Sequence, residues 1–318
     1  MSEFVLNDID FVKHTSPEEL AELFAELSEL RGAIRDFDWR GTPNVNYHFF
    51  LTAHSREEDF EGLSEAIADA DVVIPEVPGW SHKTLVAMRN IAKGKKRHLR
   101  PNPSVEGMTD EQARHVFGDA KAIQGLLFDT HKRIEFIDLP REQAAPLYKQ
   151  VFRATTFTFG QFESVDEMVD HYVYAKSMEA KFQLTREINM MGRLDKLFAE
   201  QKEPLNVLIS LGADHTFITH QLMDRGEKVK RTFYPKPLIY PYRDEMTRRL
   251  IFGVSFDSTL AMKAISEGGL AFHYSSENEA HTANSIDAAK AMRESLDQYE
   301  PAELVHFLGR AIQRNRRR

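Results

Sequence analysis

The stretch NVLISLGADHTF, residues Asn206 to Phe217, decides the fold because a buried strand runs directly into a polar turn. Val207 to Leu211 are consecutive apolar residues, a pattern typical of a strand that is covered on both faces. A glycine, an aspartate and a histidine follow soon after, and a helical pattern begins behind them. A strand that leads through a short polar turn into a helix is the repeating unit of parallel α/β sheets.

Four further segments carry a strand pattern, and helical patterns separate most of them along the chain. The predicted strands are residues 47–52, 71–76, 133–138, 207–211 and 228–234. This alternation predicts an α/β fold with a mostly parallel central sheet that is flanked by helices. The active edge of such a sheet lies at the carboxyl ends of its strands, and the terminal regions of this chain are predicted to be helical.

No glycine- or serine-rich linker divides the chain, so we predict a single α/β domain over residues 1–318. Within it we expect three parts. Residues 1–40 would form a helical extension, residues 45–235 the core, and residues 244–318 a helical C-terminal region.

The composition excludes several classes of protein and site. The 318 residues carry a formal net charge of -8, which argues against nucleic acid as a partner. Because the chain has no cysteine, disulfides, thiolate metal ligands and a cysteine nucleophile are excluded. The start lacks the pattern of a signal peptide, and no apolar run reaches the roughly 18 residues of a membrane span. We therefore expect a soluble, cytoplasmic protein. A homo-oligomer assembled through the helical terminal regions is one further expectation.

Polar side chains follow four of the predicted strands. His54 comes after the first, Glu76 and Asp138 close the next two, and Asp214 and His215 follow the fourth. Because the carboxyl ends of parallel strands share one edge, these residues could meet in a single cleft. The alternative is that each of them is polar because the chain reaches solvent there.

Two kinds of chemistry suit this set of residues. His54, Glu76 and His215 form a nitrogen and oxygen ligand set for manganese, cobalt or zinc, and such a metal would activate a water molecule. Without a metal, a histidine beside a carboxylate is a general base, and Glu76 would be part of it. In either case Asp138 or Asp214 would orient a histidine.

Two other features are candidates for contact with a substrate. Arg186 lies on a predicted long helix, where it either forms a surface salt bridge or points into the cleft to bind a carboxylate or stabilise an oxyanion. Tyr234, Tyr240 and Tyr242 belong to a loop rich in proline and tyrosine behind the fifth strand. This loop either lines a substrate groove or packs as a structural element.

Four segments together resemble the TraB/PrgY/GumN/TIKI family, and they occur in the same order as in that family. The segments are YHFFLTAHSREEDFEGLSEAIADADVVIPE at residues 47–76, RIEFID at 133–138, LTREINMMGRLDKL at 184–197 and NVLISLGADHTFITHQLMDRGEKVKRTF at 206–233. Two departures stand out. Leu51 occupies the glycine position of the first Gly-x-x-His pattern, and the family's Glu-Arg-Asn reads Thr185-Arg186-Glu187.

The resemblance extends to a wider superfamily that includes erythromycin esterase-like and ChaN-like proteins. It implies metal-dependent proteolysis or hydrolysis by histidine and glutamate, carried here by His54, Glu76 and His215 with Arg186 in support. We therefore expect a metal-assisted hydrolase of amide or ester bonds, acting on a peptide or a small molecule. The alternative is a non-catalytic binding or regulatory protein that holds a ligand or peptide in the same cleft.

Overall fold

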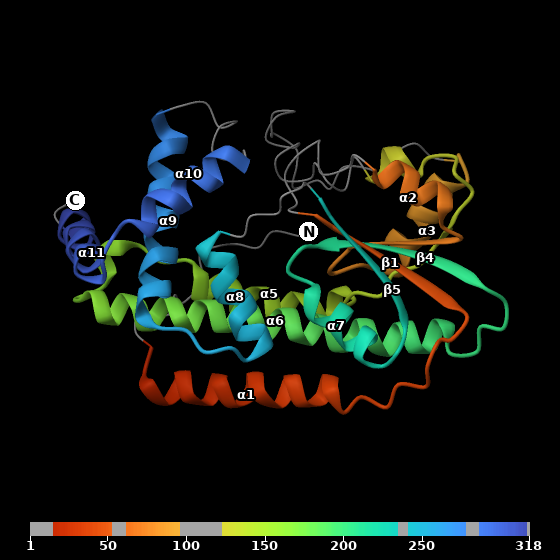
Figure 1. The fold of residues 1–318 in the computed structure, drawn as a ribbon, viewed down its shortest axis with the longest axis horizontal. Coiled ribbons are helices and arrows are strands. Elements are labelled where there is room, and N and C mark those ends of the chain that lie inside the picture. Colours follow the sequence, from red (N-terminus) through yellow and green to blue (C-terminus); the bar gives the residue numbers. More distant parts are fainter. Residues whose placement is uncertain (1–14, 53–61, 96–122, 235–240, 278–285, 317–318) are drawn as a thin grey trace. The chain divides into compact units, whose positions relative to one another are not determined.

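A computed structural model describes residues 15–52, 62–95, 123–234, 241–277 and 286–316 of the chain (Figure 1). These residues form two compact units. Unit 1 consists of the described parts of Asp36–Ala145 and Arg186–Leu238. Unit 2 consists of the described parts of Ile9–Arg35, Pro146–Thr185 and Ile239–Arg318. The predicted division into an extension, a core and a C-terminal region stays a prediction.

Unit 1 is built on a five-stranded sheet in the order β3-β2-β4-β1-β5. All neighbouring strands are parallel, so the predicted α/β fold with a parallel sheet is confirmed. The strands are β1 (Val45–Thr52), β2 (Val72–Pro75), β3 (Arg133–Ile134), β4 (Leu205–Gly212) and β5 (Lys228–Tyr234).

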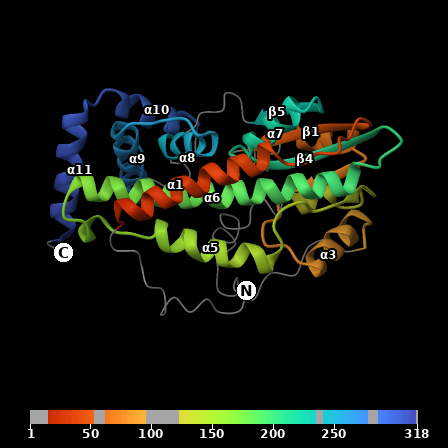
Figure 2. The same ribbon diagram turned by 90° about the horizontal axis from the view of Figure 1, so that it is seen from below.

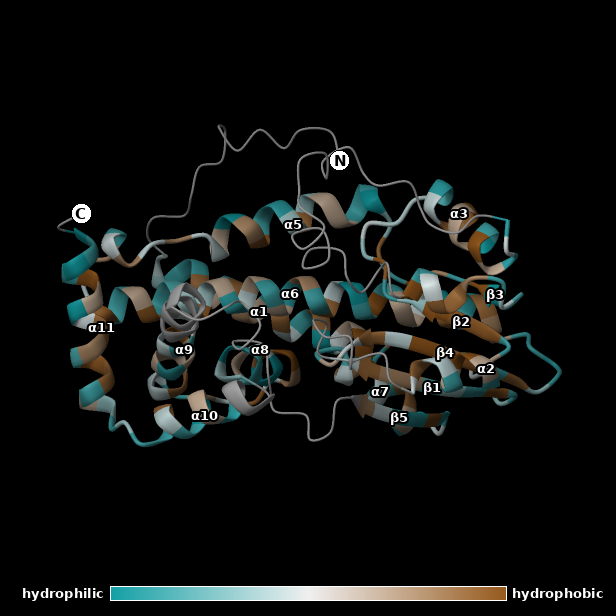
Figure 3. Ribbon diagram, turned by 90° about the horizontal axis from the view of Figure 1, so that it is seen from above, coloured by the Kyte–Doolittle hydropathy of each residue, from teal (hydrophilic) through white to brown (hydrophobic). Residues whose placement is uncertain are grey.

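Helices cover both faces of this sheet, as the buried apolar runs of its central strands β2 and β4 require. Phe50, Val73 and Leu208 of the strands share a buried cluster with residues of α2 (Leu63–Asp69) and α3 (His82–Ala92). These two helices lie over one face in Figure 1, and β2 and β4 are predominantly hydrophobic in Figure 3.

The opposite face packs on the C-terminal part of α6 (Val165–Phe198), a helix of 34 residues that contributes to both units. The rings of Tyr47 on β1 and Phe198 on α6 meet edge to face, with centroids 6.4 Å apart. Another helix of unit 1, α7 (Thr216–Asp224), follows β4.

The third strand is shorter than the predicted 133–138, and helix α6 explains why. Beyond β3 the carbonyl groups of Phe136 and Ile137 accept hydrogen bonds from side chains of α6. Arg193 Nε donates to Phe136 O at 2.9 Å, and Asn189 Nδ2 donates to Ile137 O at 2.7 Å. These bonds replace a strand partner and guide the chain toward Asp138.

In unit 2 the regular secondary structure of the described residues is all helical. Here α1 (Pro17–Arg35) and the N-terminal part of α6 lie side by side (Figure 2), joined by an ion pair of 2.7 Å between Glu26 and Lys181. In the segments that the structure describes, every helix is too short or too polar to cross a membrane. Besides the N-terminal part of α6, the helices that lie wholly or largely in this unit are α1 (Pro17–Arg35), α5 (Arg141–Thr155), α8 (Tyr242–Phe252), α9 (Ser258–Glu277), α10 (Ile286–Asp297) and α11 (Pro301–Arg316).

Candidate active site at the carboxyl edge of the sheet

Glu76 is fixed at the carboxyl edge of the sheet by the register of its strand. The preceding residue, Pro75, pairs with Ser210, so Glu76 arrives beside the end of β4. There the backbone N–H of Gly212 donates to Glu76 Oε2 at 2.6 Å. Its side chain is 13% exposed, the largest exposed fraction in the group described below.

Arg186 joins Glu76 to Asp138. Its Nε donates to Asp138 Oδ1 at 3.0 Å, its Nη2 donates to Asp138 Oδ2 at 2.6 Å, and Nη2 also donates to Glu76 Oε1. Burial lowers the pKa of the guanidinium, but Glu76 and Asp138 raise it by more, so the net shift is upward. Arg186 is therefore a permanent buried cation between two carboxylates.

His215 lies on the turn between β4 and α7, where it is the N-cap residue of α7. Its imidazole is buried between two carboxylates. Nε2 is 3.3 Å from Glu76 Oε1, and Nδ1 is 3.4 Å from Glu187 Oε1. Burial lowers the pKa of His215 and Arg186 lowers it further, yet Glu76 and Glu187 raise it by more, which favours the imidazolium.

Glu187 is the member of this group to which the sequence analysis gave no role. It is fully buried, and its carboxylate oxygens have no well-aligned hydrogen bond within the described residues. A signal was present in the sequence. Glu187 follows Leu184 by three residues and precedes Met191 by four, so it lies on the apolar face of its helix. An acid in that position has to find a partner in the interior.

We call the five side chains Glu76, Asp138, Arg186, Glu187 and His215 the edge cluster. Three carboxylates, one permanent cation and one titratable imidazole meet there, delivered by the segments that follow β2 and β3, by α6 and by the turn after β4. The structure thus brings together Glu76, Arg186 and His215, all predicted as site residues. Asp138 contacts Arg186, and Glu76 and Glu187 are carboxylates of the described residues that contact His215.

The other predicted residues are placed as follows. Asp214 lies half-buried on the turn before His215. Tyr242 begins α8 in unit 2, and its hydroxyl donates to Asp297. His54, Tyr240 and the side chain of Tyr234 lie outside the described part of the chain.

The described residues do not fit a metal site by themselves. Both oxygens of Glu76 accept N–H donors, and one of those donors is the Arg186 cation, which a metal ion would have to displace. No group of three or more histidine, aspartate or glutamate side chains within the described segments is arranged to hold a metal. A metal ligated by His54, Glu76 and His215 therefore stays a prediction.

Comparison with known proteins returned no match: no family model, no curated protein and no solved structure is similar to this chain. The resemblance to the TraB/PrgY/GumN/TIKI family accordingly remains an expectation from the four sequence segments.

The chemistry open to the edge cluster is proton transfer. His215 Nε2 and Glu76 Oε1 lie 3.3 Å apart, so the two atoms can share a single proton. When the imidazole is neutral at Nε2, this pair can take up a proton. When it is protonated, the pair can return that proton.

Proposed function

We propose that the chain is a hydrolase of amide or ester bonds in which Glu76 and His215 activate the attacking water. The observation that carries this proposal is the buried imidazole held between two carboxylates, at the sheet edge where open α/β sheets place their sites. The resemblance to TIKI and erythromycin esterase-like proteins supports the same reaction class, with a peptide or a small ester as substrate.

In the proposed reaction the base is the Glu76–His215 pair with an unprotonated Nε2. Water gives a proton to Glu76, where it is shared with Nε2, and the hydroxide oxygen bonds to the carbonyl carbon. The pair then returns the proton to the leaving amine or alcohol as the carbon–nitrogen or carbon–oxygen bond breaks. Since Glu76 is the most exposed member of the cluster, it is the group that meets the water.

Arg186 and Asp138 act as positioning residues in this proposal. Arg186 donates hydrogen bonds from Nε and Nη2 to the two carboxylates, and this fixes the orientation of Glu76 Oε1 toward His215. The predicted role of Arg186 in stabilising an oxyanion is a separate proposal, because it requires a substrate in contact with the guanidinium.

The test is to compare Glu76→Gln with Glu135→Gln on ester and peptide substrates. Glu135 is a matched control, since its side chain is 11% exposed and paired with Arg89 and Arg133, also in unit 1. We expect Glu76→Gln to lower kcat by about 10²- to 10⁴-fold. Glu135→Gln should keep the wild-type kcat.

Two outcomes would count against this assignment. If the wild type and Glu76→Gln have the same kcat, Glu76 takes no part in the reaction. A wild-type protein that turns over none of the substrates would favour the non-catalytic alternative, in which the same edge binds a ligand or peptide.

A divalent metal is a second proposal, and it depends on His54. Elemental mass spectrometry on protein purified without chelator or nickel affinity should be compared between the wild type and His54→Ala/His215→Ala. Near-stoichiometric manganese, cobalt or zinc that is lost in the double variant would support the metal. No metal in either protein would support the metal-free pair.

A further inference from the structure

We infer that Glu187 is a positioning residue that selects the tautomer and the orientation of the His215 imidazole. This inference deepens the proposed function, and only its kinetic test rests on that function. It starts from the ion-pair distance of 3.4 Å between His215 Nδ1 and Glu187 Oε1 and from the complete burial of both side chains.

A carboxylate in the position of Glu187 is costly unless a positive group compensates it. Burying an ionised carboxylate without a partner costs several kcal/mol, roughly the free energy that folds a small domain. The preceding residue, Arg186, directs Nε and Nη2 to Asp138 and Glu76. Among the described residues, the group that lies within ion-pair distance of Glu187 is the imidazole of His215. Glu187 therefore favours a proton on Nδ1.

A proton on Nδ1 decides what the other ring nitrogen can do. When Nδ1–H faces Glu187, the lone pair of the neutral ring is on Nε2, which is the nitrogen beside Glu76 Oε1. The proton-accepting side of His215 thus faces Glu76, the least buried carboxylate of the edge cluster. This is the logic by which a buried acid holds a catalytic histidine in the productive tautomer.

Replacing Glu187 by glutamine should reverse the tautomer while preserving the packing. The side-chain amide introduced by Glu187→Gln can donate to Nδ1, and this places the ring proton on Nε2, where it blocks uptake of a proton from Glu76. We expect kcat to fall by about 10²- to 10⁴-fold with little change in KM. Glu187→Asp keeps a carboxylate and should recover part of the lost kcat.

The control is Asp195→Asn. Asp195 is also a buried carboxylate on the C-terminal part of α6, but it bonds to Arg40 and not to the histidine. Its variant should retain the wild-type kcat, which would separate a general loss of charge on this helix from the specific effect at Glu187.

The decisive readout is the ¹⁵N spectrum of His215, because it requires no substrate. The chain has 13 histidines, so a His215→Gln sample identifies the resonance by its disappearance. At a pH where the ring is neutral, we expect wild-type His215 to carry its proton on Nδ1. In Glu187→Gln the proton should move to Nε2.

The outcomes separate this inference from the proposed function. Wild-type protein with the neutral-ring proton on Nε2 overturns the role of Glu187, even if Glu187→Gln does not fold. A folded Glu187→Gln with an unchanged tautomer and a kcat within about threefold of wild type, a difference below 1 kcal/mol, overturns it too. If the tautomer of His215 changes in Glu187→Gln but the wild type hydrolyses none of the substrates, the inference is supported and the proposed function is wrong.

Discussion

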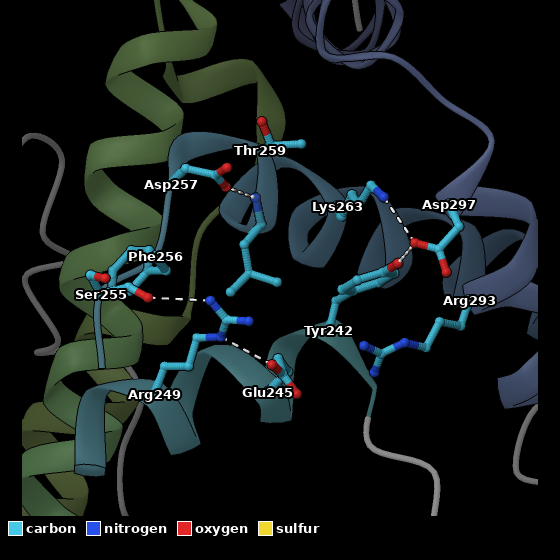
Figure 4. A pocket seen from close by; sticks show the side chains of 11 residues that line it. Tyr242, Glu245, Arg249, Ser255, Phe256, Asp257, Thr259, Lys263, Arg293 and Asp297 are labelled. Carbon is cyan, nitrogen blue, oxygen red and sulfur yellow. Dashed lines mark hydrogen bonds and ion pairs between the residues drawn. The ribbon is translucent and has the colours of Figure 1, made fainter. Parts of the chain in front are cut away.

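Two groups of ionisable side chains, one in each unit, both place carboxylates beside cationic groups but differ in how deeply they are buried. The edge cluster of unit 1 keeps its side chains between fully buried and 13% exposed. The pocket cluster of unit 2, which we define as Tyr242, Lys263, Arg293 and Asp297, lies on the wall of an open pocket of about 570 Å³ (Figure 4). Its carboxylate, Asp297, is 55% exposed.

The contacts within the pocket cluster are as close as those of the edge cluster. The Tyr242 hydroxyl donates to Asp297, and Lys263 Nζ lies 2.9 Å from Asp297 Oδ1. Arg293 and Lys263 approach the Tyr242 ring, with 4.5 Å and 5.3 Å to its centroid. Short distances alone therefore do not distinguish a site from a surface network.

The two clusters differ in how strictly their charges must be matched. Water screens the pocket cluster, so an unbalanced charge there costs little. The edge cluster holds three carboxylates against one permanent cation, and its fifth member, His215, can add a second positive charge. Because these groups are buried, the charge state of each one strongly affects the charge states of the others. Such coupling is what a proton-transfer site requires.

Removing the central cation of the edge cluster should have a large effect on stability. Arg186→Met leaves the carboxylates of Glu76 and Asp138 buried without their partner, so we expect the free energy of unfolding to fall by about 3–5 kcal/mol. Urea denaturation measures this change. The matched variant is Arg249→Met, because the side chain of Arg249 is 39% exposed and is paired with Glu245 in the pocket wall of unit 2.

Arg249→Met should lower the free energy of unfolding by less than about 1 kcal/mol. If the Arg186 and Arg249 variants lose the same amount, depth does not separate the edge cluster from a half-exposed ion pair of the pocket wall. In that case burial gives no reason to place the functional site at the edge cluster.

The charge state of His215 should make the stability of the protein depend on pH. Because Glu76 and Glu187 raise the pKa of the buried imidazole above 6.5, against burial and Arg186, its stabilising effect is complete below that value. The effect is lost as pH rises through the folded-state pKa. We expect the difference in unfolding free energy between the wild type and His215→Gln to shrink above pH 6.5.

Urea denaturation in steps from about pH 6 to pH 9 measures this difference, a range that brackets the ordinary histidine pKa. Arg186 stays charged throughout and does not contribute to the slope. A difference that is constant over the whole range would mean that the imidazole does not change charge there, and would contradict a raised pKa.

Much of unit 1 could be predicted from the sequence because its central strands β2 and β4 are buried on both faces. That environment requires the apolar runs seen in these two strands, whereas β5 lies at the edge of the sheet and reads KVKRTFY. A parallel arrangement then brings the carboxyl ends of the strands together. The meeting of Glu76 with His215, and of Asp138 with Arg186, follows from that edge. The order of the strands has no comparable signal, since it depends on contacts between distant segments.

The partner of Glu187 cannot be predicted from the sequence, because the helical pattern does not show which segment each of two neighbouring residues of α6 meets. Neighbouring helical residues point about 100° apart, so Arg186 and Glu187 can reach different parts of one cluster. Arg186 reaches the ends of β2 and β3, and Glu187 reaches the turn after β4. Only the rotation of α6 against the sheet, fixed by packing such as that of Tyr47 on Phe198, determines which residue meets which partner.

Neutralising the carboxylate of the pocket cluster should have the smallest effect. Tyr242 and Lys263 lower the pKa of Asp297, so its charge stabilises the fold above the ordinary value of 3.8 and that contribution disappears as pH falls. Because more than half of the Asp297 side chain is exposed, Asp297→Asn should lower the free energy of unfolding by less than about 1 kcal/mol at neutral pH. Salt near 1 M, where the Debye length is about 3 Å, should remove this difference but leave that of Arg186→Met largely intact. Thermal unfolding at low and high salt compares the two variants directly. A loss in Asp297→Asn that salt does not reduce would mean that the pocket cluster is as shielded from solvent as the edge cluster, and the search for a site would then have to include unit 2.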